Sequence, residues 1–132
     1  MKIIIVEDDS ISSQILKRLV TRFGTVDHVD DGRKAVDLFR QAHESGSPYD
    51  LIFMDIMMPV VDGLESVQTI RQLEKSIGIS ESDKVKIIMT TALTDPRTVM
   101  KALYESDANS YLVKPITLQK LTGELKSLKL IS

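Results

Sequence analysis

The chain has 132 residues, of which 42% are hydrophobic and 27% charged, and we expect a single domain over residues 1–132 with no output domain attached. The formal net charge of −2 gives no reason to expect a nucleic-acid partner, which usually meets a clearly basic face. The chain has no cysteine, which excludes disulfides and thiolate metal sites.

A short apolar run at residues 3–6 follows the N-terminus, and it is too short for a signal peptide or a membrane span. We therefore expect a cytoplasmic protein with no membrane insertion. The run is continuous and β-branched, which is typical of a strand buried on both faces. Similar runs follow at residues 51–54 and 87–89, while weaker runs at residues 26–29 and 111–113 indicate edge strands.

Amphipathic stretches alternate with these runs. Apolar side chains recur at helical spacing after Ser10, Gly32, Gly63, Pro96 and Thr117. Pro96 suits a first helical turn and Thr117 suits a helix cap. The polar stretch at residues 76–84 is expected to be a loop insertion. The alternation predicts an α/β fold, a doubly wound, flavodoxin-like parallel sheet of five strands with helices on both faces.

Chemically active side chains stand at the carboxyl ends of the predicted strands. Glu7 and Asp8 follow the first strand, Asp55 the third, Thr91 the fourth and Lys114 the fifth. In an open parallel sheet the ligand site lies outside these ends, at the switch point of the strand order. If the order is 2-1-3-4-5, the first and third strands are neighbours, and the three carboxylates share one pocket.

Three carboxylates in one pocket repel each other. Two unit charges about 5 Å apart cost roughly 3 kcal/mol at an effective dielectric constant near 20. A hard divalent cation removes this repulsion, with magnesium the natural choice and manganese a substitute. Lys114 would add a second positive charge, and the Thr91 hydroxyl would donate a hydrogen bond to a phosphoryl oxygen.

Each of these residues also has a simpler structural explanation. An acidic pair after a strand is often a solvated turn or a helix cap, and Asp9 or Ser10 is the expected cap of the first helix. Asp55 is harder to explain in this way, because it lies among apolar residues where an unpaired charge is poorly tolerated. His28 and His43 are expected on the surface, away from the acidic cluster.

Together these residues resemble the receiver domains of bacterial two-component response regulators, which are CheY-like, and the resemblance covers essentially the whole chain. The matching segments are residues 5–8, 55–59 with 62–63, 91–92 and 111–115.

The resemblance implies a role for each site residue. Asp55 would be the phosphoacceptor, with Asp8 binding the metal directly, Glu7 binding it through water, and the Met57 backbone carbonyl as a further ligand.

Three more residues would respond to the phosphoryl group. Thr91 and Lys114 would contact it, and Tyr111 resembles the aromatic switch residue that turns inward when the threonine moves. The Lys114–Pro115 bond is often cis in this family, and Asp107 stands where many relatives carry glycine.

By the same resemblance, the phosphoryl donor is a histidine kinase or a histidine phosphotransfer protein. The fourth helix, fifth strand and fifth helix would form the face that binds a downstream protein. We expect a switch that promotes its own phosphorylation and dephosphorylation, and not a turnover enzyme.

Two other functions stay open at this point. A phosphatase of the haloacid dehalogenase type would use Asp55 as its nucleophile. Such enzymes require a second aspartate two residues after the nucleophile, where this chain has Met57. A flavin-binding, flavodoxin-like module needs a polar or glycine-rich phosphate loop after the first strand. The acidic residues 7–9 would repel a phosphate there.

Overall fold

The computed structural model describes residues 1–56, 63–92 and 96–132. In chain order, its elements are β1 (Lys2–Val6), α1 (Ser10–Val20), β2 (Thr25–Val29), α2 (Gly32–Glu44), β3 (Leu51–Asp55), α3 (Gly63–Ile77), the short 3₁₀ helix η1 (Glu81–Asp83), β4 (Lys86–Thr91), α4 (Pro96–Ser106), β5 (Ser110–Val113) and α5 (Leu118–Ser127). The strands form one parallel sheet in the order β2-β1-β3-β4-β5, which confirms the predicted fold and its two edge strands.

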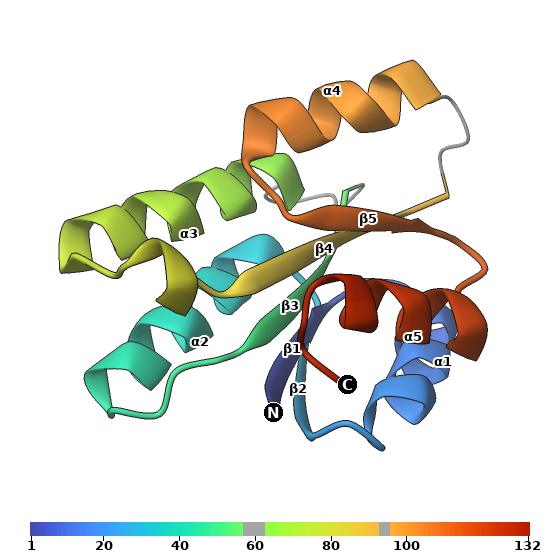
Figure 1. The fold of residues 1–132 in the computed structure, drawn as a ribbon, viewed down its shortest axis with the longest axis horizontal. Coiled ribbons are helices and arrows are strands. Elements are labelled where there is room, and N and C mark those ends of the chain that lie inside the picture. The colour runs from blue at the N-terminus through green and yellow to red at the C-terminus, as the bar shows by residue number, and fades with distance from the viewer. Residues whose placement is uncertain (57–62, 93–95) are drawn as a thin grey trace.

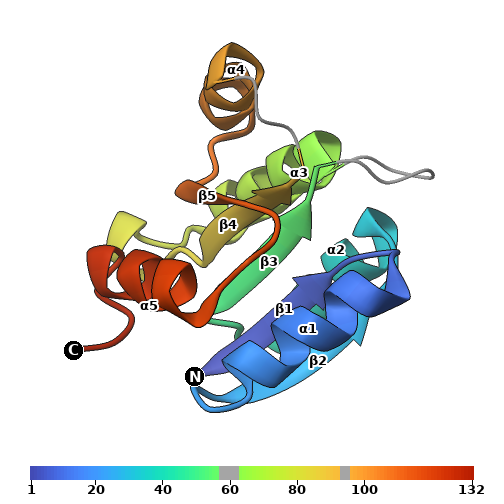
Figure 2. The ribbon, with the colours of Figure 1, turned by 90° about the vertical axis from the view of Figure 1, so that its right-hand side faces the viewer.

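Helices cover both faces of the sheet (Figure 1 and Figure 2). On one face, α1 and α5 bury a cluster that includes Ile3, Ile5, Phe53, Leu16 and Leu121. On the other face, α2 and α3 bury a second cluster that includes Ile4, Met54, Ile87, Phe39 and Ile70. The central strands are apolar on both sides because each side faces a core.

Side-chain caps fix the starts of three helices. Asp9 accepts a hydrogen bond from the Ser12 amide of α1 at 2.9 Å, so Asp9 is the cap of the first helix. Asp31 caps α2 through the Lys34 amide at 2.8 Å, and Thr117 caps α5 in the same way, as predicted.

The prediction that residues 76–84 form a loop is only partly correct. Helix α3 continues to Ile77, and η1 occupies Glu81–Asp83. Gly78 ends α3 with a φ of 83°, and its amide donates to the Glu74 carbonyl at 3.0 Å. A glycine in the left-handed region is the commonest helix stop, so Gly78 was the signal for the true end of this helix.

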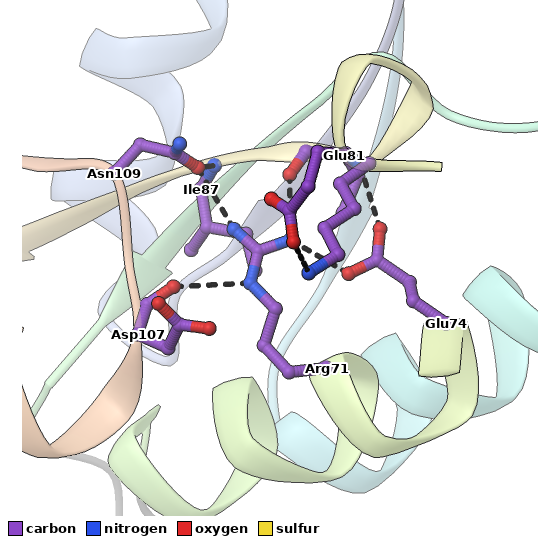
Figure 3. A network of polar contacts seen from close by, with 8 residues as sticks. Arg71, Glu74, Glu81, Ile87, Asp107 and Asn109 are labelled. Carbon is purple, nitrogen blue, oxygen red and sulfur yellow. Dashed lines mark hydrogen bonds and ion pairs between the residues drawn. The ribbon is translucent and has the colours of Figure 1, made fainter. Parts of the chain in front are cut away.

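A buried charged network ties α3 to the start of β4 and to the turn between α4 and β5 (Figure 3). The Arg71 guanidinium donates to Glu74 Oε1 at 2.7 Å, to the Asp107 carbonyl at 3.0 Å and to Asn109 Oδ1 at 2.8 Å. It also donates to the Val85 carbonyl at 2.8 Å. The Arg71 side chain is only 10% exposed and that of Glu74 is fully buried, so the pair is shielded from water.

The same network also supplies side-chain hydrogen-bond acceptors for two backbone amides at the start of β4. Glu74 Oε2 accepts from the Val85 amide at 2.7 Å, and Asn109 Oδ1 accepts from the Ile87 amide at 2.8 Å. Asp107 ends α4 with a φ of 63°, a conformation that aspartate tolerates better than most residues. Arg71 therefore holds the end of α4 near the amino-terminal end of β4. The acidic residues lie at the opposite, carboxyl ends of the strands.

Among the helices of residues 1–56, 63–92 and 96–132, none combines the length and the apolar character that crossing a membrane requires.

Candidate functional site

The acidic residues meet at the carboxyl edge of the sheet. Glu7 directly follows β1, Asp8 comes next, and Asp55 is the last residue of β3. Because β1 and β3 are paired neighbours, one carboxylate oxygen from each of these residues lies within 4.8 Å of the others. Glu7 and Asp55 are only 3% and 5% exposed, whereas Asp8 is open to solvent.

Lys114 brings a positive charge into this cluster from the loop after β5. Its ammonium donates to Glu7 Oε1 and lies 3.5 Å from Asp55 Oδ2. Its backbone amide donates to the Thr91 carbonyl at 2.7 Å, which fixes the loop against the end of β4. The Lys114–Pro115 peptide bond is cis, as the resemblance implied.

The cluster has unbalanced charge. Burial and a hydrogen bond with Asp55 raise the pKa of Glu7 to about 7, although its contact with Lys114 acts in the opposite direction. Burial alone would lower the pKa of Lys114, but the Glu7 and Asp55 carboxylates outweigh it and raise that pKa. A single ammonium therefore does not compensate the buried carboxylates, and a further cation would be stabilised here.

The raised pKa of Glu7 predicts a specific dependence of stability on pH. Folded Glu7 holds its proton up to about pH 7, whereas an ordinary glutamate releases it near pH 4.5. The folded state thus binds more protons between these values, and in metal-free buffer the free energy of unfolding should fall as pH rises from about 5 to 7. Urea unfolding at several pH values measures this slope.

Glu7→Gln provides the control, since it removes the titrating group and should flatten the slope. Adding Mg²⁺ to the wild type should flatten it too, because a bound cation favours the ionised carboxylate. Equal slopes in wild type and Glu7→Gln without metal would show that burial does not raise the pKa of Glu7.

Gly63 lies directly against the backbone of Asp55. A Cβ atom at Gly63 would meet the Asp55 carbonyl oxygen at 2.2 Å and its carbonyl carbon at 3.0 Å. The Gly63 amide also donates to the Ile56 carbonyl at 3.3 Å. The start of α3 can approach the end of β3 this closely only because residue 63 has no side chain.

Gly63→Ala should therefore lower the free energy of unfolding by about 1–3 kcal/mol, the usual cost of overpacking a tight site. Gly123→Ala is a matched control within α5, where an added Cβ meets no atom within 4 Å. It should raise stability by about 0.5–1 kcal/mol, because alanine is the better helix former. Urea denaturation compares the two, and equal effects would contradict the close approach.

The other predicted site residues have different outcomes. Thr91 is the last residue of β4 and is fully buried. Tyr111 lies in β5, partly buried against the core under α2 and α3. Their switch roles stay predictions. The Met57 carbonyl lies outside the described residues.

His28 is exposed, as predicted, but the prediction that it lies away from the cluster is wrong. Its Nε2 atom is 2.8 Å from the backbone carbonyl oxygen of Glu7. His28 is on edge strand β2 in register with Ile5, and its ring reaches along the strand to the end of β1. Sequence reasoning missed this contact because it depends on the register between the two strands. The other histidine, His43, is in α2 with its ring against Phe39.

A hollow of about 280 Å³ opens beside the cluster. Its lining includes Glu7 and Lys114 of the cluster together with Ile15 and Leu16 of α1 and Ile116 before α5. Two large apolar side chains of α1, Ile11 and Ile15, are 67% and 50% exposed. An apolar surface therefore adjoins the buried carboxylates.

Comparison with known proteins identifies relatives for nearly the whole chain. The family model of the response regulator receiver domain matches residues 3–126. The osmosensing histidine protein kinase SLN1 of Saccharomyces cerevisiae is 34% identical over 92% of this chain, which spans 9% of that protein. The probable transcriptional regulatory protein SilR of Salmonella typhimurium is 33% identical over 97% of this chain, which spans 50% of that protein. The chain thus spans half or less of these two relatives.

Solved structures agree with the sequence relatives. The receiver domain of S. cerevisiae Ssk1, solved with the histidine phosphotransfer protein Ypd1, has a TM-score of 0.81 and 30% identity, covering 96% of this chain and 86% of that one. The receiver domain of the Arabidopsis thaliana histidine kinase CKI1, complexed with Mg²⁺ and BeF₃⁻, has a TM-score of 0.82 and 26% identity, covering 98% and 90%.

The match to the family model and the identity to SLN1 and SilR extend over most of the residues that build the sheet and the acidic cluster. The chain belongs to the response regulator receiver domain family.

Proposed function

We propose that this protein is a phosphorylation switch that accepts a phosphoryl group on Asp55 with the help of a divalent cation, preferably Mg²⁺. The observation that carries the proposal is the pocket of Glu7, Asp8 and Asp55 with Lys114 in contact with two of its three carboxylates.

The donor set fits a hard divalent cation. Three carboxylates supply oxygen ligands within 4.8 Å of one another, and the exposed Asp8 leaves one side open to water. Asp8 and Asp55 would hold the metal directly and Glu7 through water, with manganese as a substitute. When bound, the cation would neutralise charge on the transferring phosphoryl oxygens. The CKI1 receiver domain, which was solved with Mg²⁺, supports this assignment.

Asp55, Lys114 and Thr91 have different roles in the transfer of the phosphoryl group. An Asp55 carboxylate oxygen forms a bond to phosphorus while the bond from phosphorus to the donor histidine nitrogen breaks. The donor imidazole leaves with the bonding electron pair and takes up a proton from water. Lys114, already beside Asp55, balances the negative charge on the phosphoryl oxygens, and Thr91 donates a hydrogen bond to one of them.

The donor in this proposal is a phosphohistidine on a histidine kinase or phosphotransfer protein. The Ssk1 receiver domain, solved with such a phosphotransfer protein, supports this class of partner. The hollow between α1 and the loop before α5 offers a route, because it leads from solvent to Glu7 and Lys114. An imidazole ring presented there would be shielded from water by Ile15 and Ile116.

The output in this proposal is the surface of α4, β5 and α5, with Thr91 and Tyr111 as the switch pair. Met100 and Tyr104 of α4 are 59% and 91% exposed and lie one helical turn apart, so α4 offers apolar contacts to a protein partner. Tyr111 lies beside this surface on β5. Changing its position would alter what a downstream protein contacts.

We do not propose a turnover enzyme. Membership of the receiver family leaves the phosphatase and flavin-binding alternatives without support. The test is incubation of the purified protein with acetyl phosphate, with and without Mg²⁺, followed by intact-mass analysis. A base-labile phosphoryl adduct that requires Mg²⁺ is expected. An adduct that forms equally well in EDTA, or none under either condition, would contradict the proposal.

A further inference from the structure

His28 touches the backbone of the acidic loop from the neighbouring strand. Its ring Nε2 lies 2.8 Å from the Glu7 carbonyl oxygen. One peptide earlier, the Glu7 amide donates to the Val29 carbonyl at 3.1 Å. The peptide groups on both sides of the Glu7 Cα atom are thus held by β2, the first by its backbone and the second by a side chain.

The contact defines which nitrogen of the ring carries hydrogen. A carbonyl oxygen only accepts hydrogen bonds, so Nε2 must be the donor, and the neutral ring must be the Nε2–H tautomer. With Nε2 engaged in this way, His28 is not itself a metal ligand through that atom.

The peptide that His28 holds joins Glu7 to Asp8. A change in either torsion beside this peptide, the ψ angle of Glu7 or the φ angle of Asp8, would turn Asp8 relative to Glu7 and so change how the two carboxylates are directed relative to each other. On the far side the chain is already fixed, because Asp9 caps α1 through the Ser12 amide. The His28 contact therefore adds a restraint to the loop between β1 and α1, at the peptide that joins its two acids.

We propose that His28 is a positioning residue of the metal site, acting through the Glu7 carbonyl to keep the Glu7 and Asp8 carboxylates directed at one cation. The inference rests on the proposed function, since it assumes that these acids bind a divalent metal. Groups that orient metal ligands without touching the metal commonly contribute to affinity in this way.

The first test is the affinity of the whole chain for Mg²⁺, measured by isothermal titration calorimetry. His28→Ala should weaken binding about tenfold, the lower end of the loss typical for groups that orient metal ligands. His28→Gln should restore most of it, because its amide N–H can reach the same carbonyl. His43→Ala is the matched control, since His43 packs on Phe39 in α2 and should leave the affinity unchanged.

The second test is the tautomer of His28 in the metal-free protein, read from the ring ¹⁵N chemical shifts at about pH 8. The Nε2–H tautomer is expected, and a dominant Nδ1–H tautomer would overturn the inference. An unchanged Mg²⁺ affinity in His28→Ala would overturn it as well and would leave the proposed function intact. Failure of the wild type to bind Mg²⁺ would overturn both.

Discussion

Replacing Asp55 with asparagine is expected to abolish the Mg²⁺-dependent phosphoryl adduct entirely. The amide is a poor nucleophile, and the substitution also removes one anionic ligand from the cation. The fold should persist, because asparagine has nearly the same shape. In metal-free buffer the variant should be at least as stable as the wild type, since one of the crowded negative charges is gone. Intact-mass analysis after incubation with acetyl phosphate measures the adduct.

Asp37→Asn is the matched control for Asp55. Asp37 is an exposed residue of α2 whose partner, Arg40, lies 3.4 Å away on the surface. This variant should acquire the adduct at the wild-type rate. A base-labile phosphoryl adduct on Asp55→Asn as large as that on Asp37→Asn would place the phosphoacceptor at another residue.

Replacing Arg71 with alanine should lower the free energy of unfolding by about 3–5 kcal/mol, more than we expect for Gly63→Ala. The change leaves the fully buried Glu74 carboxylate without its cation. It also removes the Arg71 donors to the Asp107 and Val85 carbonyls and one of the two donors to Asn109 Oδ1, which keeps the Ile87 amide. The loss is a large fraction of the roughly 5–15 kcal/mol that stabilises a typical domain. Urea denaturation measures it.

Two further variants separate the causes of this loss. Arg40→Ala removes an exposed pair and should cost less than about 1 kcal/mol. The double variant Arg71→Met with Glu74→Gln removes both buried charges, while glutamine can still accept from the Val85 amide. It should be more stable than Arg71→Ala, because no unpaired charge remains. If Arg71→Ala costs no more than Arg40→Ala, the network is not an important source of stability.

The sequence predicted the sheet well because its three central strands, β1, β3 and β4, are buried on both faces. Residues 3–6, 51–54 and 87–89 have no polar side chains, a pattern that exposed or half-buried strands rarely show. Once the strands were placed, parallel topology alone brought Glu7, Asp8 and Asp55 to one edge. The acidic cluster was therefore predictable from strand order, without knowledge of any side-chain contact.

The Arg71 network and the His28 contact could not be predicted in this way. Arg71 and Glu74 are three residues apart on a helix, which usually indicates an ordinary surface pair. They are buried because the start of β4 and the turn after α4 pack over them. Likewise, His28 meets Glu7 only because of the register between β1 and β2. Both contacts depend on tertiary packing that sequence periodicity does not encode.

The most direct test of the central claim is a crystal structure of this protein grown with Mg²⁺ and BeF₃⁻, the ligands present in the CKI1 receiver structure. We predict the cation between Asp8 and Asp55, with the beryllofluoride on Asp55 in contact with Lys114 and Thr91. A structure in which the carboxylates of Glu7, Asp8 and Asp55 hold no cation, or in which beryllofluoride binds at another residue, would contradict the account.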